Sequence, residues 1–246
     1  MPSPSKRKNL CIFGDSHIGC VKNALTQKIF KSRRALDFEF WGADGPRFRG
    51  LDLEGSTIVP RAEVLETVRL VNGKGRDILD PADFDAILFM GARIRTHEFF
   101  EPHLHRMQQV DGYLSDAVFR QNCEDWLPKN RFYRAAKAMA AVGHGRIFFA
   151  PTTFLTEGFE AQITKGCQDA VQASAGDRQK IWAELIRVAA NDGIDLMPQS
   201  EETIANGCMT KRTYSNVLSN GEFDPVHRNP EYAAILLKDV VDRFYA

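Results

Sequence analysis

The sequence has no excess of charge of one sign and no long apolar run. Lys plus Arg and Asp plus Glu number 32 each among 246 residues, so the formal net charge is zero. A balanced chain gives no global electrostatic argument for binding nucleic acid or an anionic membrane. No stretch approaches the roughly 20 apolar residues that a membrane span requires. The polar N-terminal segment lacks the apolar run and cleavage site of a secretory signal, so we expect a cytoplasmic protein.

Cysteine is scarce, and its spacing is irregular. The five cysteines are odd in number and scattered, without a Cys-x-x-Cys pair, which argues against a disulfide framework and a structural zinc site. His97, His103 and His105 lie close together in sequence but show no recognised ligand spacing, and we interpret them as solvent-facing histidines. The sequence therefore predicts no metal site.

Several common catalytic motifs are also missing. There is no Gly-x-Ser-x-Gly elbow, which weakens an assignment to the α/β-hydrolases. There is no Walker loop and no Gly-x-Gly-x-x-Gly after an expected strand, so a nucleotide cofactor has no support. We expect no cofactor.

What the chain does contain is an alternation of strand-like and helix-like segments. Apolar runs predict strands at residues 9–13, 38–41, 85–90, 146–150 and 194–197, with a minor one at 57–59. Helical periods occupy residues 18–29, most of 98–142, 168–191 and 230–245. Such alternation indicates a parallel sheet covered by helices on both faces. We expect a polar tail over residues 1–8 and one α/β domain over residues 9–246.

The residues that follow the expected strands are the ones to inspect, because ligands bind beyond the carboxyl ends of parallel strands. Gly14-Asp15-Ser16-His17 ends the first strand and places Ser16 at the start of a helix, whose free N–H groups surround any oxyanion formed there. Asp224-Pro-Val-His227 lies in a polar loop before the final helix, where one turn can present both side chains together. A hydroxyl, an imidazole and a carboxylate are the parts that serine catalysis requires.

Each of these residues also has an ordinary interpretation. Ser16 is a favoured cap of its helix, His227 a surface histidine and Asp224 a turn residue. The basic cluster at residues 31–34 follows the first helical stretch, where positive charge complements the helix dipole. For Ser16, the strand–Gly-Asp-Ser–helix context together with the distant Asp/His pair favours catalysis over capping.

At these positions the chain resembles the SGNH hydrolases, also called the GDSL-like family. Gly14-Asp15-Ser16-His17, Gly42-x-x-Gly45 and Asp224-x-x-His227 are similar to the first, second and last blocks of that family, in its order. The resemblance implies a three-layer α/β/α sandwich with a mainly parallel, flavodoxin-like sheet. It also implies Ser16 as nucleophile, His227 as base, Asp224 as its partner, and the N–H groups of Ser16 and Gly45 as an oxyanion hole.

The third block departs from the family pattern. The family has Gly-x-Asn-Asp, in which the Asn side chain donates to the oxyanion, whereas this chain has Gly91-Ala92-Arg93-Ile94. Arg93 then either replaces the amide as a cationic oxyanion donor or binds an anionic part of the substrate. Asp15, His17 and Gly91 are expected to contact the substrate.

The predicted activity is serine-dependent hydrolysis of an acyl ester on a small molecule or a glycan, with an acetyl group on a carbohydrate as one candidate. One alternative is an O-acyltransferase that uses the same triad on a sugar or other alcohol. Another is a catalytically weakened SGNH-like binding protein that kept the pocket. The acyl group, the alcohol and the oligomeric state stay open at this point.

Overall fold

Five parallel strands form the central sheet of the protein, which a computed structural model describes for residues 7–112 and 114–246. They are β1 (Lys8–Gly14), β2 (Leu36–Gly42), β5 (Ala86–Gly91), β6 (Arg146–Pro151) and β8 (Ile194–Leu196). Their order is β2-β1-β5-β6-β8, and every neighbouring pair is parallel. This is the order of a flavodoxin-like, doubly wound sheet. The predicted sheet is therefore confirmed.

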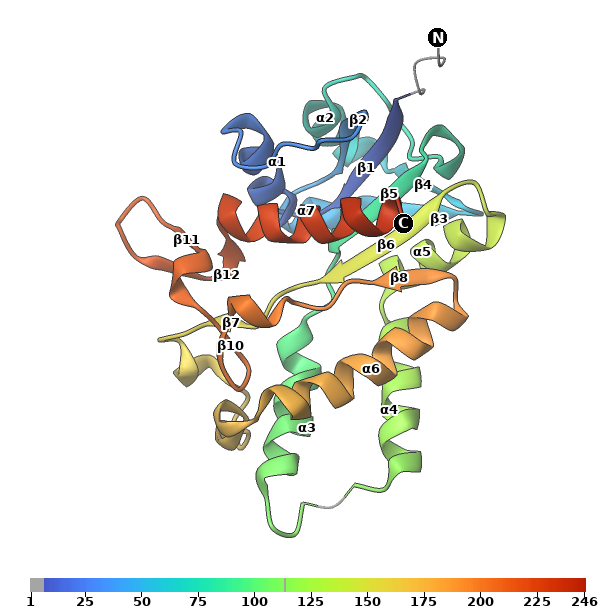
Figure 1. Ribbon diagram of the computed structural model, residues 1–246. Helices are drawn as coiled ribbons and strands as arrows, with labels where there is room; N and C mark the ends of the chain where they lie inside the picture. Colours follow the sequence, from blue (N-terminus) through green and yellow to red (C-terminus); the bar gives the residue numbers. More distant parts are fainter. Residues whose placement is uncertain (1–6, 113) are drawn as a thin grey trace.

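Helices cover both faces of this sheet. They are α1 (Ile18–Thr26), α2 (Ala62–Asn72), α3 (Thr96–Gln108), α4 (Asp116–Lys129), α5 (Arg131–Val142), α6 (Ala175–Asn191) and α7 (Pro230–Phe244). α1 and α7 pack together on one face, and α2, α5 and α6 cover the other. Figure 1 shows α7 lying across the sheet, with α3, α4 and α6 in the lower part of the view. The expected three-layer α/β/α architecture is confirmed.

The strands alternate their side chains between two apolar cores, as period-2 geometry requires. Leu10, Leu88 and Phe148 belong to the core under α1 and α7. Phe13 and Phe89 belong to the opposite core and stand side by side in register, with ring centroids 4.9 Å apart. Burial on both faces explains why these strands appear in the sequence as continuous apolar runs.

Smaller elements complete the chain. The expected minor strand at 57–59 is confirmed as part of a hairpin. The minor strands are β3 (Leu51–Glu54), β4 (Thr57–Pro60), β7 (Leu155–Thr156), β9 (Ile204–Asn206), β10 (Met209–Thr210), β11 (Ser215–Val217) and β12 (Phe223–Arg228). The 3-10 helices are η1 (Gly45–Gly50), η2 (Pro81–Asp83), η3 (Glu160–Gln162), η4 (Gln168–Gln172), η5 (Glu201–Thr203) and η6 (Arg212–Tyr214). No helix within the described part of the chain has the length and apolar character needed to cross a membrane.

Several predicted boundaries were wrong. The long helix begins at Ala175 rather than at residue 168, because Ser174 and Asp177 form a capping box there. The first helix ends at Thr26, so Ile29 lies outside it. Lys8 already belongs to β1 instead of the expected tail 1–8, whose residues 1–6 lie outside the described residues.

The most consequential error concerns residues 224–227. They were expected in a loop, but they lie in strand β12, which pairs antiparallel with β11. β12 belongs to a two-stranded ribbon, and most of its residues are only half-buried. Its sequence, Phe-Asp-Pro-Val-His-Arg, therefore lacks the apolar alternation that marks a strand.

Candidate functional site

Ser16 lies just beyond the carboxyl end of β1, in the turn that leads into α1. The ends of β1 and β2 approach closely here, since a Cβ on Gly42 would collide with the carbonyl oxygen of Gly14. This brings the segment of Ser16 near that of Gly45. His17 is the N-cap residue of α1, and no side chain caps the helix. The exposed Ser16 hydroxyl therefore does not cap the helix.

The predicted nucleophile, base and carboxylate lie together although residues 16 and 227 are 211 positions apart. The Oγ atom of Ser16 is 2.8 Å from Nε2 of His227. On the other side of the ring, Nδ1 of His227 is 2.9 Å from Oδ2 of Asp224. If Nδ1 carries the proton and donates it to the carboxylate, Nε2 is left as an acceptor for the serine hydroxyl. This is the tautomer that a general base requires.

Asp224 holds both the ring and the backbone of His227. Its Oδ1 accepts hydrogen bonds from the N–H groups of Val226 at 2.8 Å and His227 at 2.9 Å. Burial acts to raise the pKa of Asp224, but these hydrogen bonds and the His227 ring together hold that pKa below its ordinary value. The carboxylate is therefore ionised at neutral pH and suited to stabilise an imidazolium.

Arg228 fixes strand β12 against the segment that follows β6. Its side chain is 4% exposed. The guanidinium donates to the hydroxyls of Thr153 and Thr156 and to the carbonyls of Phe154 and Pro225. Burial lowers the pKa of Arg228 to about 10, which leaves it a cation at neutral pH. The strand that carries Asp224 and His227 is thus anchored by a buried charge.

A second carboxylate–imidazole pair adjoins the first. Oδ1 of Asp15 lies 2.6 Å from Nδ1 of His17, and it also accepts the His17 N–H at 3.3 Å. The ring of His17 faces that of His227 at a centroid distance of 5.0 Å. Burial acts to raise the pKa of Asp15, but His17 and then Arg93 lower it, and the net shift is downward. Nε2 of His17 is buried and has no hydrogen-bond partner among the described residues.

Arg93 connects Asp15 with Gly45. Its Nε atom is 3.4 Å from Oδ2 of Asp15, and its guanidinium donates to the carbonyl oxygen of Gly45. Gly45 is the first residue of η1, so its N–H has no acceptor within that helix. Gly91, Ala92 and Arg93 all have positive φ angles, which makes a sharp and strained turn after β5. Arg93 therefore contacts two of the predicted site segments.

A cavity of about 310 Å³ opens around Ser16. All the predicted site residues line it except Asp224, which lies behind His227, and Gly91. A Cβ on Gly91 would lie 2.9 Å from Nδ1 of His17 and 3.1 Å from Oδ1 of Asp15, so glycine leaves room for that pair. Gly91 lines a smaller adjoining cavity.

Other lining residues were not predicted as site residues. They include Arg95, His97, Thr152, Thr153, Leu155, Gln162 and Val226. Thr152 and Thr153 directly follow β6, and this strand-end position was a usable signal in the sequence. His97 was interpreted as solvent-facing, but it is half-buried in the cavity wall, and burial lowers its pKa. Its imidazole is therefore neutral at pH 7. No sequence signal marked Gln162, which is the last residue of η3.

Comparisons with known proteins give no close relative. No family model matches the chain, and no curated protein matches it. Among solved structures, the extracellular lipase from Streptomyces rimosus superposes with a TM-score of 0.47 at 12% identity, covering 94% of this chain and 99% of the lipase. The periplasmic domain of a lipopolysaccharide acetyltransferase from Salmonella ser. Paratyphi A gives 0.42 at 12% identity, covering 99% and 85% of the two chains.

Proposed function

We propose that this protein is a serine-dependent esterase in which Ser16 attacks the carbonyl carbon of an acyl ester. One observation carries the proposal: a continuous hydrogen-bonded chain runs from Ser16 through His227 to Asp224 at the wall of a cavity. The nucleophile is exposed, the base is oriented, and the carboxylate that orients it is ionised. These are the conditions for activating a hydroxyl at neutral pH.

The reaction follows from this geometry. His227 accepts the Ser16 proton at Nε2 as the bond from Oγ to the carbonyl carbon forms. The oxyanion that results then accepts hydrogen bonds from the N–H groups of Ser16 and Gly45. Collapse breaks the bond to the leaving alcohol, which takes the proton from His227. A water molecule then attacks the acyl-serine with His227 again as base, releasing the acid and restoring Ser16.

The cavity supports a short acyl group on a polar alcohol. A volume of about 310 Å³ is small for a ligand site, which favours an acetyl or similar group over a long chain. Thr152, Thr153 and Gln162 offer hydroxyl and amide groups to hydroxyls of the alcohol. An acetylated carbohydrate is the substrate class that best combines these features.

A fluorophosphonate probe tests the nucleophile directly. We expect covalent labelling of Ser16, no labelling of Ser16→Ala, and suppressed labelling of His227→Ala. Ser219→Ala is the matched control, because Ser219 is an exposed loop serine of the segment between β11 and β12, and it should label normally. Modification of a different serine would refute the assignment.

Turnover of a small acetyl or butyryl ester, lost in Ser16→Ala, tests the activity. Adding an alcohol acceptor then distinguishes the two fates of the acyl-serine. If ester product accumulates at the expense of free acid, the natural reaction is acyl transfer. A labelled but inactive protein, without turnover of any ester, would support the binding-protein alternative instead.

A further inference from the structure

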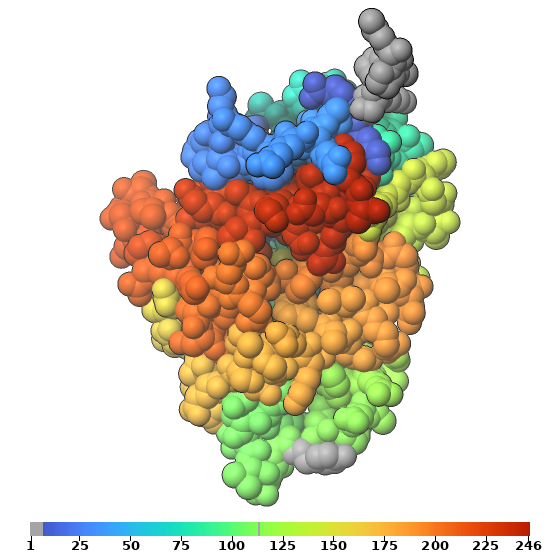
Figure 2. All heavy atoms as spheres, in the orientation of Figure 1, coloured from blue at the N-terminus to red at the C-terminus, as the bar shows by residue number. Residues whose placement is uncertain are grey.

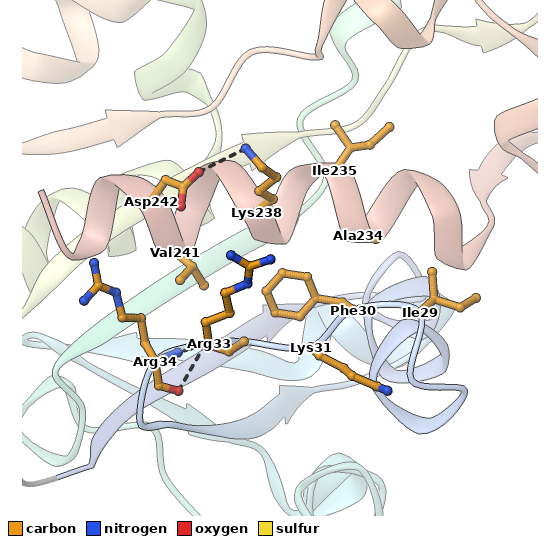
Figure 3. A pocket seen from close by; sticks show the side chains of 11 residues that line it. Ile29, Phe30, Lys31, Arg33, Arg34, Ala234, Ile235, Lys238, Val241 and Asp242 are labelled. Carbon is orange, nitrogen blue, oxygen red and sulfur yellow. Dashed lines mark hydrogen bonds and ion pairs between the residues drawn. The ribbon is translucent and has the colours of Figure 1, made fainter.

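A second and larger hollow lies on the face covered by α1 and α7, apart from the cavity at Ser16. It has a volume of about 750 Å³ and is formed by α7 and the segment 29–34 that follows α1. In Figure 2 these appear as the blue segment directly above the red helix. Figure 3 shows the ring of Phe30 directed toward α7, near Ala234 and Val241, which together make an apolar floor. We call this hollow the basic groove, because cations form its rim.

The rim cations have little internal compensation. Lys31, Arg33 and Arg34 make no ion pair with a carboxylate of residues 7–112 or 114–246, and Lys238 is paired with Asp242 at 3.1 Å. The sequence had suggested that the cluster at 31–34 complements the dipole of the first helix. That interpretation is wrong, because α1 ends at Thr26 with no basic residue in its last turn. Among the described residues, no carboxylate therefore neutralises Lys31, Arg33 or Arg34.

Positive charge continues beyond the groove. Lys8 lies over the rings of Phe244 and Tyr245, at 4.4 and 4.9 Å from their centroids, beside the carboxyl end of α7. Arg34 lies over the same Tyr245 ring at 5.2 Å. The basic surface therefore extends from the rim of the groove around the end of α7.

An apolar side chain stands among these cations. Ile29 is 40% exposed, between the exposed Lys28 and Lys31 in sequence, and it lines the groove together with the half-buried Ile235. Cations alone would suit any polyanion. Cations that alternate with an exposed aliphatic residue over an apolar floor suit a ligand with negative charge and hydrocarbon side by side.

We propose that the basic groove binds the surface of an anionic lipid bilayer. Lys31, Arg33 and Lys238 contact the headgroup phosphates and carboxylates, and Ile29 enters the boundary between headgroups and acyl chains. An acidic protein would use the cations without needing the apolar floor, which is why the lipid surface is the favoured occupant. The proposal is independent of the chemistry at Ser16.

Cosedimentation with vesicles tests this binding. We expect the protein to bind vesicles of phosphatidylcholine mixed with phosphatidylserine, and to bind pure phosphatidylcholine poorly. Each cation near such a surface strengthens partition about fivefold, so Lys31→Glu/Arg33→Glu should weaken it by about 25-fold or more. Ile29→Ser should weaken it several-fold, by about threefold to tenfold, through lost apolar contact. All three side chains are exposed, so circular dichroism should show these variants folded.

Lys165→Glu/Lys180→Glu is the matched control, with the same change of net charge at exposed sites away from the groove. It should bind within about twofold of the unaltered protein, because distant charges are screened. An equal loss of vesicle binding in this control variant would overturn the proposal. Equal binding of the unaltered protein to neutral and anionic vesicles would overturn it as well. Soluble polyglutamate provides the remaining distinction. If it displaces the protein from vesicles and Ile29→Ser has no effect, the groove is a site for acidic polypeptides and the lipid assignment is wrong.

Discussion

Replacing Arg93 with alanine removes a side chain that connects Asp15 with the carbonyl oxygen of Gly45. The segments of Ser16 and Gly45 supply the proposed oxyanion donors, so this connection sets the distance between them. A hydrogen bond to a charged group contributes about 1.5–3 kcal/mol. Because the Arg93 side chain is 35% exposed, solvent screening reduces this contribution. We expect Arg93→Ala to lower the free energy of unfolding by about 1–2 kcal/mol.

The catalytic cost of Arg93→Ala is larger than its cost in stability. A displacement of about 1 Å at a catalytic group costs roughly 10²-fold in rate, and loss of a direct oxyanion donor costs about 10²–10³-fold. We therefore expect kcat to fall at least about 10²-fold on a neutral ester with little change in KM. Steady-state kinetics and urea unfolding measure the two effects separately.

Two further variants identify how Arg93 acts. Arg93→Asn introduces the amide of the pattern that the sequence resembles, so it should recover activity over alanine if Arg93 donates directly to the oxyanion. Arg93→Lys keeps the charge beside Asp15 but loses the fork that also reaches Gly45, so it should recover stability more than rate if Arg93 positions the two segments. If Arg93 binds an anionic substrate group, alanine should raise KM for anionic esters and spare neutral ones.

Arg95→Ala is the control for these variants. Arg95 is a neighbouring, exposed arginine that pairs with Glu98 at 2.8 Å, and its loss should change stability by no more than about 0.5 kcal/mol. If Arg93→Ala leaves kcat, KM and unfolding free energy all as they are in Arg95→Ala, Arg93 has no role in the site. The alignment of the third block would then be wrong.

Other expected outcomes follow from the contacts of the site. Asp224→Asn should lower kcat by about 10⁴-fold with the fold retained by circular dichroism, because an amide no longer selects the His227 tautomer; near-normal turnover would exclude the triad. Asp15 has a lowered pKa when folded, so its ionised form contributes stability that is present at neutral pH and lost as pH falls below about 4. The difference in urea midpoint between the unaltered protein and Asp15→Asn should therefore be largest near neutral pH and shrink in acid, and a constant difference would contradict this. Arg228→Met should cost about 2–4 kcal/mol in urea unfolding, because it leaves buried hydroxyls and carbonyls without their donor.

The sheet was predictable because most of its central strands are buried on both faces. Strands such as β5, with the sequence Ala-Ile-Leu-Phe-Met-Gly, are apolar throughout and end at a glycine, so both their type and their ends are visible in the sequence. The ends of β1 and β5 also located Ser16 and Arg93, and the glycine that ends the half-buried edge strand β2 located Gly45. Local signals were sufficient wherever burial is complete.

The edge of the site was less predictable, since contacts distant in sequence determine it. Strand β12 is polar, and what fixes it is Arg228, whose partners are hydroxyls and carbonyls of residues 153–156. Threonine hydroxyls and backbone carbonyls carry no pattern that pairs them with a particular arginine. His97 was missed for a similar reason, because its place in the cavity depends on how α3 packs rather than on its neighbours in sequence.

Arg93 is coupled to Asp15, the residue that precedes Ser16. Asp15 is a carboxylate that is 4% exposed, and burying such a group is costly unless positive or hydrogen-bonding partners surround it. Its two oxygens divide these partners, with Oδ1 toward His17 and Oδ2 toward Arg93. His17, Asp15 and Arg93 therefore form one electrostatic unit that joins the turn after β1 to the turn after β5 and extends to the Gly45 carbonyl. An asparagine at position 93 would leave Oδ2 of Asp15 without a cation. Arg93 therefore stabilises the buried Asp15–His17 pair beside Ser16.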